Sequence, residues 1–183
     1  MATESPNDAP GRLELLREFV NSVTLPEGPD NLETLEGARA WCAEHGLPPL
    51  ENQPELERLR GFREALRAVL FANNGEGDPS AAWQLIQPYA DAAHLKVTID
   101  PVRGPLLRPE CEDCADRVIS QVLVILYDSI ATGAWPRMRA CRRASCQWAY
   151  YDQSKNGSKA WCSMETCGNR EKAQRRRSRD RTL

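Results

Sequence analysis

The sequence has few histidines and none of the common catalytic motifs. Its two histidines, His45 and His94, do not fall in an HExxH pattern or in another metal-ligand spacing. A glycine-rich phosphate loop and a serine nucleophile elbow are also absent from the sequence. Because so few catalytic constellations are visible, we predict that the protein is not an enzyme.

The chain also lacks a long apolar run, and we expect no leader sequence. Its most apolar stretch, residues 122–127, is far shorter than the roughly 20 residues that a membrane-spanning helix needs. Residues 1–8 contain neither the basic region nor the apolar region of a signal peptide. We therefore expect a cytoplasmic protein without a membrane partner. In a reducing compartment, its seven cysteines favour metal binding over three disulfides and a free thiol.

The net charge of −2 conceals two regions of opposite sign. Residues 137–183 contain 13 Lys and Arg and 4 Asp and Glu, a net charge of +9, whereas residues 1–136 carry a net charge of −11. The basic C-terminal region indicates an anionic partner such as nucleic acid, and the acidic remainder indicates a second role or a shielding surface. A solvated acidic surface with a disordered basic tail is the simpler alternative.

Residues 12–133 are predicted to form a mainly helical domain with one small β-hairpin, after a disordered segment at residues 1–11. Apolar residues at helical spacing predict a first helix that begins near Leu13 and ends before Pro26. Asp30, with a glutamate three residues later, resembles a capping box that opens a second helix.

Polar capping residues and a change of period define the rest of this domain. Two further helices are predicted to begin after Asn52 and Asp78. Alternating apolar and polar residues at 95–99 predict a strand, and residues 106–107 are expected to pair back with it. A final helix at about 113–132 is apolar on all sides, so we expect it at the centre of the core.

Four cysteines near the C-terminus form the most specific pattern in the chain. They are Cys141, Cys146, Cys162 and Cys167, and they read C-x4-C, fifteen residues, C-x4-C. Two thiolate pairs separated by a hairpin-length segment are what a tetrahedral structural zinc site requires. We therefore predict that these four residues bind one Zn²⁺ per chain.

The residues around the cysteines predict a treble-clef-like zinc finger. Residues 146–151 are typical of a strand, Asn156 and Gly157 of a hairpin turn, and residues 158–162 of a return strand. A basic helix is expected to begin at Cys167. In so small a module, zinc would supply most of the folding free energy, on the order of 10 kcal/mol. Together with the helical domain, this gives an α+β fold class.

A family resemblance supports this interpretation. Residues 167–170 read CGNR, which resembles the signature of the CGNR zinc finger, and residues 154–164 and the Cys141-x4-Cys146-x-Trp148 pattern are similar to the same family. The helical domain resembles the ABATE domain that usually precedes this finger, with the sequence FVNS at residues 19–22 as a weaker cue. The resemblance implies a finger at residues 137–180 and a bacterial, stress-linked transcription regulator that binds DNA through it.

The finger contains several candidate nucleic-acid contacts. Gly168 is expected to allow a tight bend beside the metal, and Asn169 to hydrogen-bond backbone groups near the helix start. Arg170 is expected to contact phosphate or base edges. Lysines at the hairpin tip and a basic stripe on the helix are predicted to bind phosphates, and these residues are Lys155, Lys159, Lys172, Arg175, Arg176 and Arg179.

Three cysteines and one histidine are expected to have structural roles. Cys42 fits a core position. Cys111 and Cys114 form a CxxC pair among acidic residues, which raise thiol pKa values and oppose reactivity, so a structural role is favoured over a redox or accessory metal role. His45 is expected to cap a helix C-terminus.

The sequence thus predicts a zinc-dependent, DNA-binding transcription regulator whose helical domain senses a small-molecule effector or mediates assembly. A homodimer is expected because two-fold symmetry matches palindromic DNA sites. One alternative is an RNA-binding or ribosome-associated protein, because aromatic residues beside basic ones also suit stacking on single strands. The others are a zinc-held protein-interaction module and a redox switch at Cys111 and Cys114.

Overall fold

The computed structural model describes residues 7–110 and 114–180, apart from the side chains of residues 175, 179 and 180. Its helices are α1 (Leu13–Val20), α2 (Leu35–Glu44), α3 (Gln53–Asn73), α4 (Pro79–Gln84), α5 (Gln87–Ala92), α6 (Cys114–Ala131), η1 (Trp135–Arg137), η2 (Met164–Gly168) and α7 (Asn169–Asp180). Its strands are β1 (Leu95–Asp100), β2 (Gly104–Pro109), β3 (Met138–Ala140) and β4 (Ala149–Tyr151). The elements confirm the predicted α+β class. No helix in the described part is long and apolar enough to cross a membrane.

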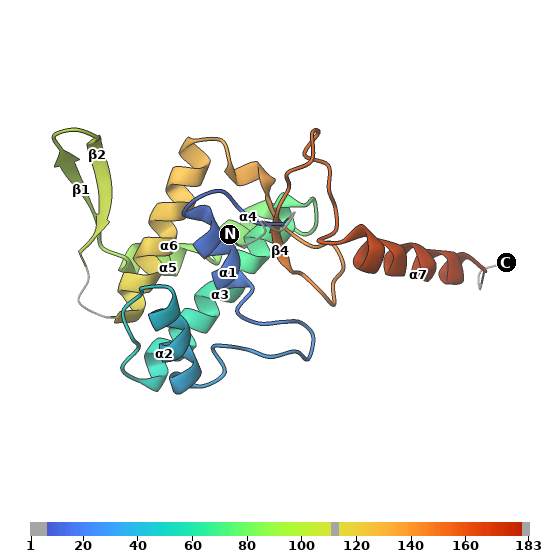
Figure 1. Ribbon diagram of the computed structural model, residues 1–183, viewed down its shortest axis with the longest axis horizontal. Coiled ribbons are helices and arrows are strands. Elements are labelled where there is room, and N and C mark those ends of the chain that lie inside the picture. Colours follow the sequence, from blue (N-terminus) through green and yellow to red (C-terminus); the bar gives the residue numbers. More distant parts are fainter. Residues whose placement is uncertain (1–6, 111–113, 181–183) are drawn as a thin grey trace.

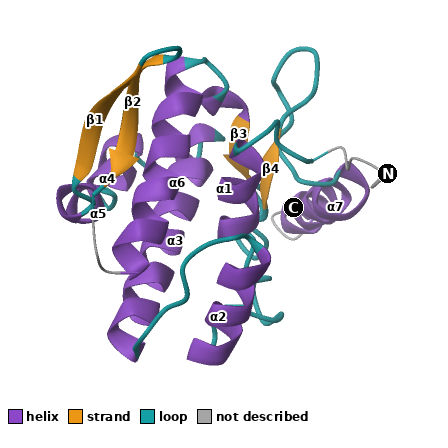
Figure 2. Ribbon diagram, turned by 60° about the vertical axis from the view of Figure 1, so that its left-hand side comes forward, coloured by secondary structure: helices purple, strands orange, loops and turns teal. Residues whose placement is uncertain are grey.

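Helices α3 and α6 pack against each other at the centre of the molecule, as Figure 2 shows. Their facing leucine, valine and isoleucine side chains have almost no exposed surface; these include Leu56, Leu59 and Leu66 of α3 and Val118, Ile119 and Val122 of α6. The sequence places α6 at the centre of the core, and the structure confirms it. Only its outer side is open, where Tyr127 is 58% exposed and Ile130 is 49% exposed.

The helix starts follow the predicted capping residues in two of three cases. Asn52 accepts a hydrogen bond from the backbone N–H of Glu55, and the Glu55 carboxylate accepts one from the backbone N–H of Glu51. Asp78 likewise accepts from the backbone N–H of Ser80 at the start of α4. These contacts satisfy N–H groups that have no partner within the helix.

The prediction that Asp30 caps the second helix is wrong. Thr34 caps α2 instead, through a 3.1 Å hydrogen bond from the backbone N–H of Gly37. Asp30 forms two hydrogen bonds with the guanidinium of Arg63, at 2.6 and 2.9 Å. Because Arg63 is only 4% exposed, its charge needs a carboxylate partner in the interior, and Asp30 supplies it.

Residues 7–11, which the sequence predicts to be disordered, instead make specific contacts, whereas residues 1–6 lie outside the described part. The backbone O of Asn7 accepts a 3.0 Å hydrogen bond from the backbone N–H of Tyr151 in β4. Asp8 pairs with Arg17 at 3.2 Å. The segment is ordered because it pairs with elements that are distant in the sequence, which local composition does not reveal.

Two elements project from opposite ends of the molecule (Figure 1). One is the antiparallel β1–β2 hairpin, in which Leu95 pairs with Pro109 and Asp100 with Gly104, as the strand pattern predicts. The other is α7, which extends away from the remaining helices. The hairpin belongs to the acidic N-terminal region of the sequence, and α7 belongs to the basic C-terminal region.

The helical part and the first half of the finger share one core. Met138 and Ala140 of β3 and Ala149 of β4 belong to the same buried cluster as the helices, with β3 packed on α3 and β4 on α1. Asn74, at the end of α3, donates 2.8 Å hydrogen bonds to the backbone O atoms of Ala140 and Ala160. The finger is thus fixed relative to the helices.

Candidate metal centre

The first cysteine pair lies on a tight turn between β3 and β4. The backbone N–H of Cys141 donates to the backbone O of Trp148 at 3.0 Å, and that of Cys146 donates to the backbone O of Arg143 at 2.8 Å. Gln147 closes the turn with a positive φ of 45°. These contacts bend the backbone so that both thiols lie on one side of the turn.

The strand pairing in the finger differs from the predicted hairpin. Strand β4 falls within the predicted strand 146–151, but its partner is β3, with Met138 opposite Tyr151 and Ala140 opposite Ala149. Residues 158–162 are not a strand. Within the described part of the chain, one backbone hydrogen bond joins them to the first turn, from Arg142 N to Ala160 O at 3.1 Å.

A buried aspartate organises the segment that the sequence predicts to be the hairpin turn. Asp152 has no exposed surface, and its two carboxylate oxygens accept 2.9 Å hydrogen bonds from the backbone N–H groups of Ser154 and Lys159. These bonds hold its pKa below the ordinary value, although burial alone would raise it. The loop is therefore closed by a side chain and not by strand pairing.

The second cysteine pair lies where the chain enters its C-terminal helix. Ser163 accepts a 3.3 Å hydrogen bond from the backbone N–H of Thr166 and so caps the short η2 turn. Cys167 lies in that turn, and α7 continues from Asn169. The metal site therefore holds the first turn of the basic helix.

The four cysteine sulfurs converge on one point. All four lie within 4.8 Å of one another, with 3.7 Å between Cys146 and Cys162 and 3.8 Å between Cys162 and Cys167. Four Zn–S bonds of about 2.3 Å in a tetrahedron would place the sulfurs about 3.8 Å apart. The donor set and spacing fit one structural Zn²⁺, as the sequence predicts.

The thiols cannot all ionise without a cation. The pKa of Cys141 is lowered because Cys146 and Cys162 donate hydrogen bonds to its thiolate. The pKa values of Cys146 and Cys162 are raised, first because of those hydrogen bonds to Cys141 and further because of burial. A divalent cation compensates the accumulated negative charge, so metal binding and loss of the remaining protons are coupled.

Gly168 and Asn169 have structural positions beside the metal. Gly168 is not among the residues with a positive φ, so its backbone conformation is one that other residues can also adopt. A Cβ atom there would require the flexible end of the Met164 side chain to move. Asn169 donates a 3.1 Å hydrogen bond to the backbone O of Glu165, which is the kind of local backbone contact that the sequence predicts.

The candidate nucleic-acid residues have different surroundings. Arg170, Lys172 and Arg176 are exposed on α7, whereas the side chains of Arg175 and Arg179 lie outside the described part. Lys155 is exposed on the loop after β4. Lys159 is half-buried, with its ammonium 2.5 Å from Asn7 Oδ1 and 5.1 Å from the centre of the Tyr150 ring, so this charge has internal partners.

A cavity of about 660 Å³ lies beside the metal centre, and sequence reasoning did not find it. Two arginines, Arg143 and Arg170, line it together with the thiols of Cys146, Cys162 and Cys167. Residues 24–26, between α1 and α2, form another part of its wall. The sequence signals were Arg143, inside the first C-x4-C turn, and Arg170, in the CGNR motif. The contribution of residues 24–26 depends on the tertiary fold.

Cys42, Cys114 and His45, for which the sequence predicts structural roles, lie in the helical part of the protein. Cys42 is fully buried in α2, and burial raises the pKa of its thiol to about 11. Cys114 is half-buried at the start of α6, whereas Cys111 lies outside the described residues. His45 is the C-terminal cap of α2, and its Nδ1 is 2.8 Å from the backbone O of Trp41, in agreement with the predicted capping role.

Fold and site together define a helical protein with a C-terminal four-cysteine zinc finger. Residues 13–134 match the model of the ABATE family, described as "Putative stress-induced transcription regulator". Residues 137–180 match the model of the CGNR zinc finger. The chain belongs to the ABATE family and carries a CGNR zinc finger. No curated protein matches the chain.

Proposed function

We propose that this protein is a zinc-dependent, DNA-binding transcription regulator that acts by binding and not by catalysis. The finger and α7 contact DNA, and the helical part senses a small-molecule effector or mediates assembly into a homodimer. The main support for the proposal is the position of α7, a basic helix that follows the metal centre and projects from the rest of the molecule (Figure 1).

The charges of α7 suit a groove bounded by phosphates on both sides. Arg170 and Arg177 are seven residues apart and share one face, whereas Lys172 and Arg176 are four apart on the opposite face. An α-helix with its side chains is about 10–12 Å wide, and the major groove of B-DNA is about 12 Å wide. Basic residues on both faces would then meet both phosphate backbones.

Zinc has a positioning role in this proposal. Bound by the four cysteines, it would supply the crosslink between the β3–β4 turn and the first turn of α7. Because the β3–β4 turn is fixed to the core, this crosslink would set the direction in which α7 leaves the molecule. The chain's own arginines and lysines would then contact the phosphates.

Burial of Tyr150 and partial burial of the other aromatic residues of the finger favour duplex DNA over single-stranded RNA. Stacking on bases needs exposed aromatic rings. Tyr150 has no exposed surface, its hydroxyl donates to Lys159 O, and the indole N–H of Trp161 is also buried. Trp148, Tyr151 and Trp161 are only partly exposed, so the finger offers more charge than stacking surface.

Fluorescence anisotropy with a random DNA duplex and an RNA hairpin tests the proposal, using the zinc-loaded full chain at several salt concentrations. We expect tighter binding to the duplex. We also expect that Lys172→Ala with Arg176→Ala weakens it at least tenfold and lowers the slope of log K against log salt by about 2.

The matched control is Lys96→Ala with Arg103→Ala, which removes two positive charges from the β1–β2 hairpin at the other end of the molecule. Equal losses in the two double variants would show that only net charge matters and would contradict a DNA-binding role for α7. Preference for the RNA hairpin would support the RNA-binding alternative.

A further inference from the structure

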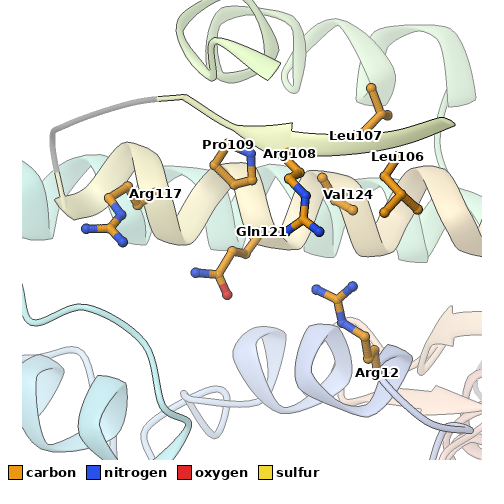
Figure 3. Close-up of a pocket in the computed structure, with 8 residues that line it drawn as sticks. All are labelled: Arg12, Leu106, Leu107, Arg108, Pro109, Arg117, Gln121 and Val124. Carbon is orange, nitrogen blue, oxygen red and sulfur yellow. The ribbon is translucent and has the colours of Figure 1, made fainter. Parts of the chain in front are cut away.

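A second cavity lies between the β1–β2 hairpin and the body of the helical part, far from the zinc site. It measures about 340 Å³ and is lined by Arg12 before α1, Leu106, Leu107, Arg108 and Pro109 of β2, and Arg117, Gln121 and Val124 of α6. Figure 3 shows that Arg12 and Arg108 extend toward each other across it, with Gln121 beside them. Residues 117, 121 and 124 share one face of α6 because they are four and three residues apart.

The charge of this cavity is unusual for an acidic domain. Several other arginines of the domain pair with carboxylates, as Arg58 does with Asp116 at 2.7 Å. Within the described residues, the side chains of Arg12, Arg108 and Arg117 form no ion pair or hydrogen bond. Asp100 has an electrostatic attraction to Arg108, but its carboxylate already accepts hydrogen bonds from two backbone N–H groups of its own hairpin turn.

Positively charged side chains that point toward each other repel, and an anion between them removes the repulsion. Guanidinium groups are well suited to this role, because each presents paired N–H donors that match a carboxylate or a phosphate. The side-chain amide of Gln121 provides a further hydrogen-bonding group at the same place.

A cavity of about 190 Å³, lined mainly by apolar residues, adjoins the arginine cavity and shares Leu106, Leu107 and Val124 with it. Val97, Pro105 and Tyr127 line the rest of the 190 Å³ cavity, and Val97 and Tyr127 are 62% and 58% exposed. Asp128 also lies in its lining. A carboxylate there disfavours a second anionic group, so a ligand would place its charge at the arginines and its apolar part under the hairpin.

We propose that these two adjoining cavities together bind a small amphipathic organic anion. Arg12, Arg108 and Arg117 hold its charged group, and the apolar side chains of β2 and α6 cover its hydrocarbon part. Ligand sites in proteins typically combine an apolar lining with a few convergent polar groups in this way. That such a ligand regulates DNA binding rests on the function proposed above, whereas its binding does not.

Isothermal titration calorimetry of the zinc-loaded full chain, without DNA, tests the site. Octanoate and octyl phosphate are the probes and distinguish a carboxylate from a phosphate headgroup. Octanol lacks the charge and inorganic phosphate lacks the hydrocarbon part. We expect one of the two anionic probes to bind with 1:1 stoichiometry and both controls to bind at least tenfold more weakly.

Variants identify the groups responsible. Arg108→Ala with Arg117→Ala is expected to weaken binding at least tenfold, and Arg103→Ala, an exposed arginine in the turn of the same hairpin, to leave it unchanged. Thermal unfolding checks that each variant folds. The proposal is overturned if neither anionic probe binds, if octanol binds equally well, or if the double variant retains wild-type affinity. Because no DNA is present, none of these results depends on the proposed DNA binding.

Discussion

The side-chain amide of Asn21 forms two hydrogen bonds with the backbone of Ala149, each 2.8 Å long, across 128 residues of sequence. Asn21 follows α1, and Ala149 begins β4 directly after the first cysteine turn. One side chain thus satisfies both the N–H and the C=O of a fully buried residue. This pair fixes the finger to the helical part independently of the metal.

We expect Asn21→Ala to lower the free energy of unfolding by about 1–3 kcal/mol, because it leaves two buried backbone groups without partners. Urea unfolding of the zinc-loaded protein measures this change. Asn156→Ala, on the exposed loop after β4, is the matched control and should change stability little. Similar stabilities of the two variants would contradict the structural role of Asn21.

Chelation of zinc is expected to unfold only part of the finger. Since β3 and β4 belong to the common core, they should remain folded, whereas residues 158–180 lose the crosslink that holds them. Hydrogen exchange with and without chelator measures this: α3 and α6 should keep their protection, and residues 158–180 should lose it until zinc is restored. Loss of protection in α3 would show that the core itself depends on the metal.

Removing one cysteine of the cluster is expected to abolish zinc binding. Cys162→Ser replaces a thiolate by a hydroxyl that does not ionise at neutral pH, and a metal analysis should then find almost none of the single zinc ion. Cys114→Ser, outside the cluster, should retain it. If Cys162→Ser keeps full zinc content, the assigned ligand set is wrong.

The ion pair between Asp30 and Arg63 is expected to make stability depend on pH. Burial alone would raise the pKa of Asp30, but the hydrogen bonds and the charge of Arg63 outweigh it and hold the pKa below its ordinary value of 3.8. Because the folded-state pKa is the lower one, the stabilisation is present above pH 3.8 and is lost as the pH falls through the folded-state pKa.

Asp30→Asn should therefore destabilise the protein by about 2–4 kcal/mol near neutral pH, because it leaves the buried Arg63 charge without its main partner. Urea unfolding of both proteins over a pH series should show this difference shrinking below pH 3.8. A difference that stays constant with pH would mean that the lost hydrogen bonds, and not the charge, dominate.

Lys155 and Lys159, both predicted to bind phosphate, should have different effects on stability and DNA binding when replaced. Lys159→Ala is expected to reduce stability by about 1 kcal/mol, because its ammonium lies over the Tyr150 ring and contacts Asn7. Lys155→Ala, on the exposed loop, should leave stability unchanged and weaken DNA binding modestly. Thermal unfolding and fluorescence anisotropy measure the two effects. The opposite pattern would mean that the loop rearranges in solution.

Local patterns predicted the features that local interactions form. The four cysteines, the cap at Asn52 and the β1–β2 hairpin depend on spacing, capping and alternation over a few residues, and the structure contains all three. The apolar character of α6 also predicted its central position correctly, since a helix that is apolar all round must be buried.

The errors arose where distant residues decide the outcome. Asp30 has the spacing of a helix cap, but it forms an ion pair with the buried Arg63 instead. The Asn156–Gly157 pair is typical of a hairpin, but the backbone N–H of Lys159 bonds to Asp152 instead of to a facing strand. Strand β3 has only three residues, too few to show a period, and it forms because the cysteine turn returns the chain onto it.

The shared core also bears on where this chain can be divided. The sequence suggests a cut between the two family matches, near Gly133, but a fragment starting there would expose Met138, Ala140 and Ala149, which are buried against α1 and α3. Grafting the finger onto another protein at that point would transplant half of an interface without its counterpart. A chimera that exchanges only residues 158–180 would leave this interface whole and replace only the second cysteine pair and α7.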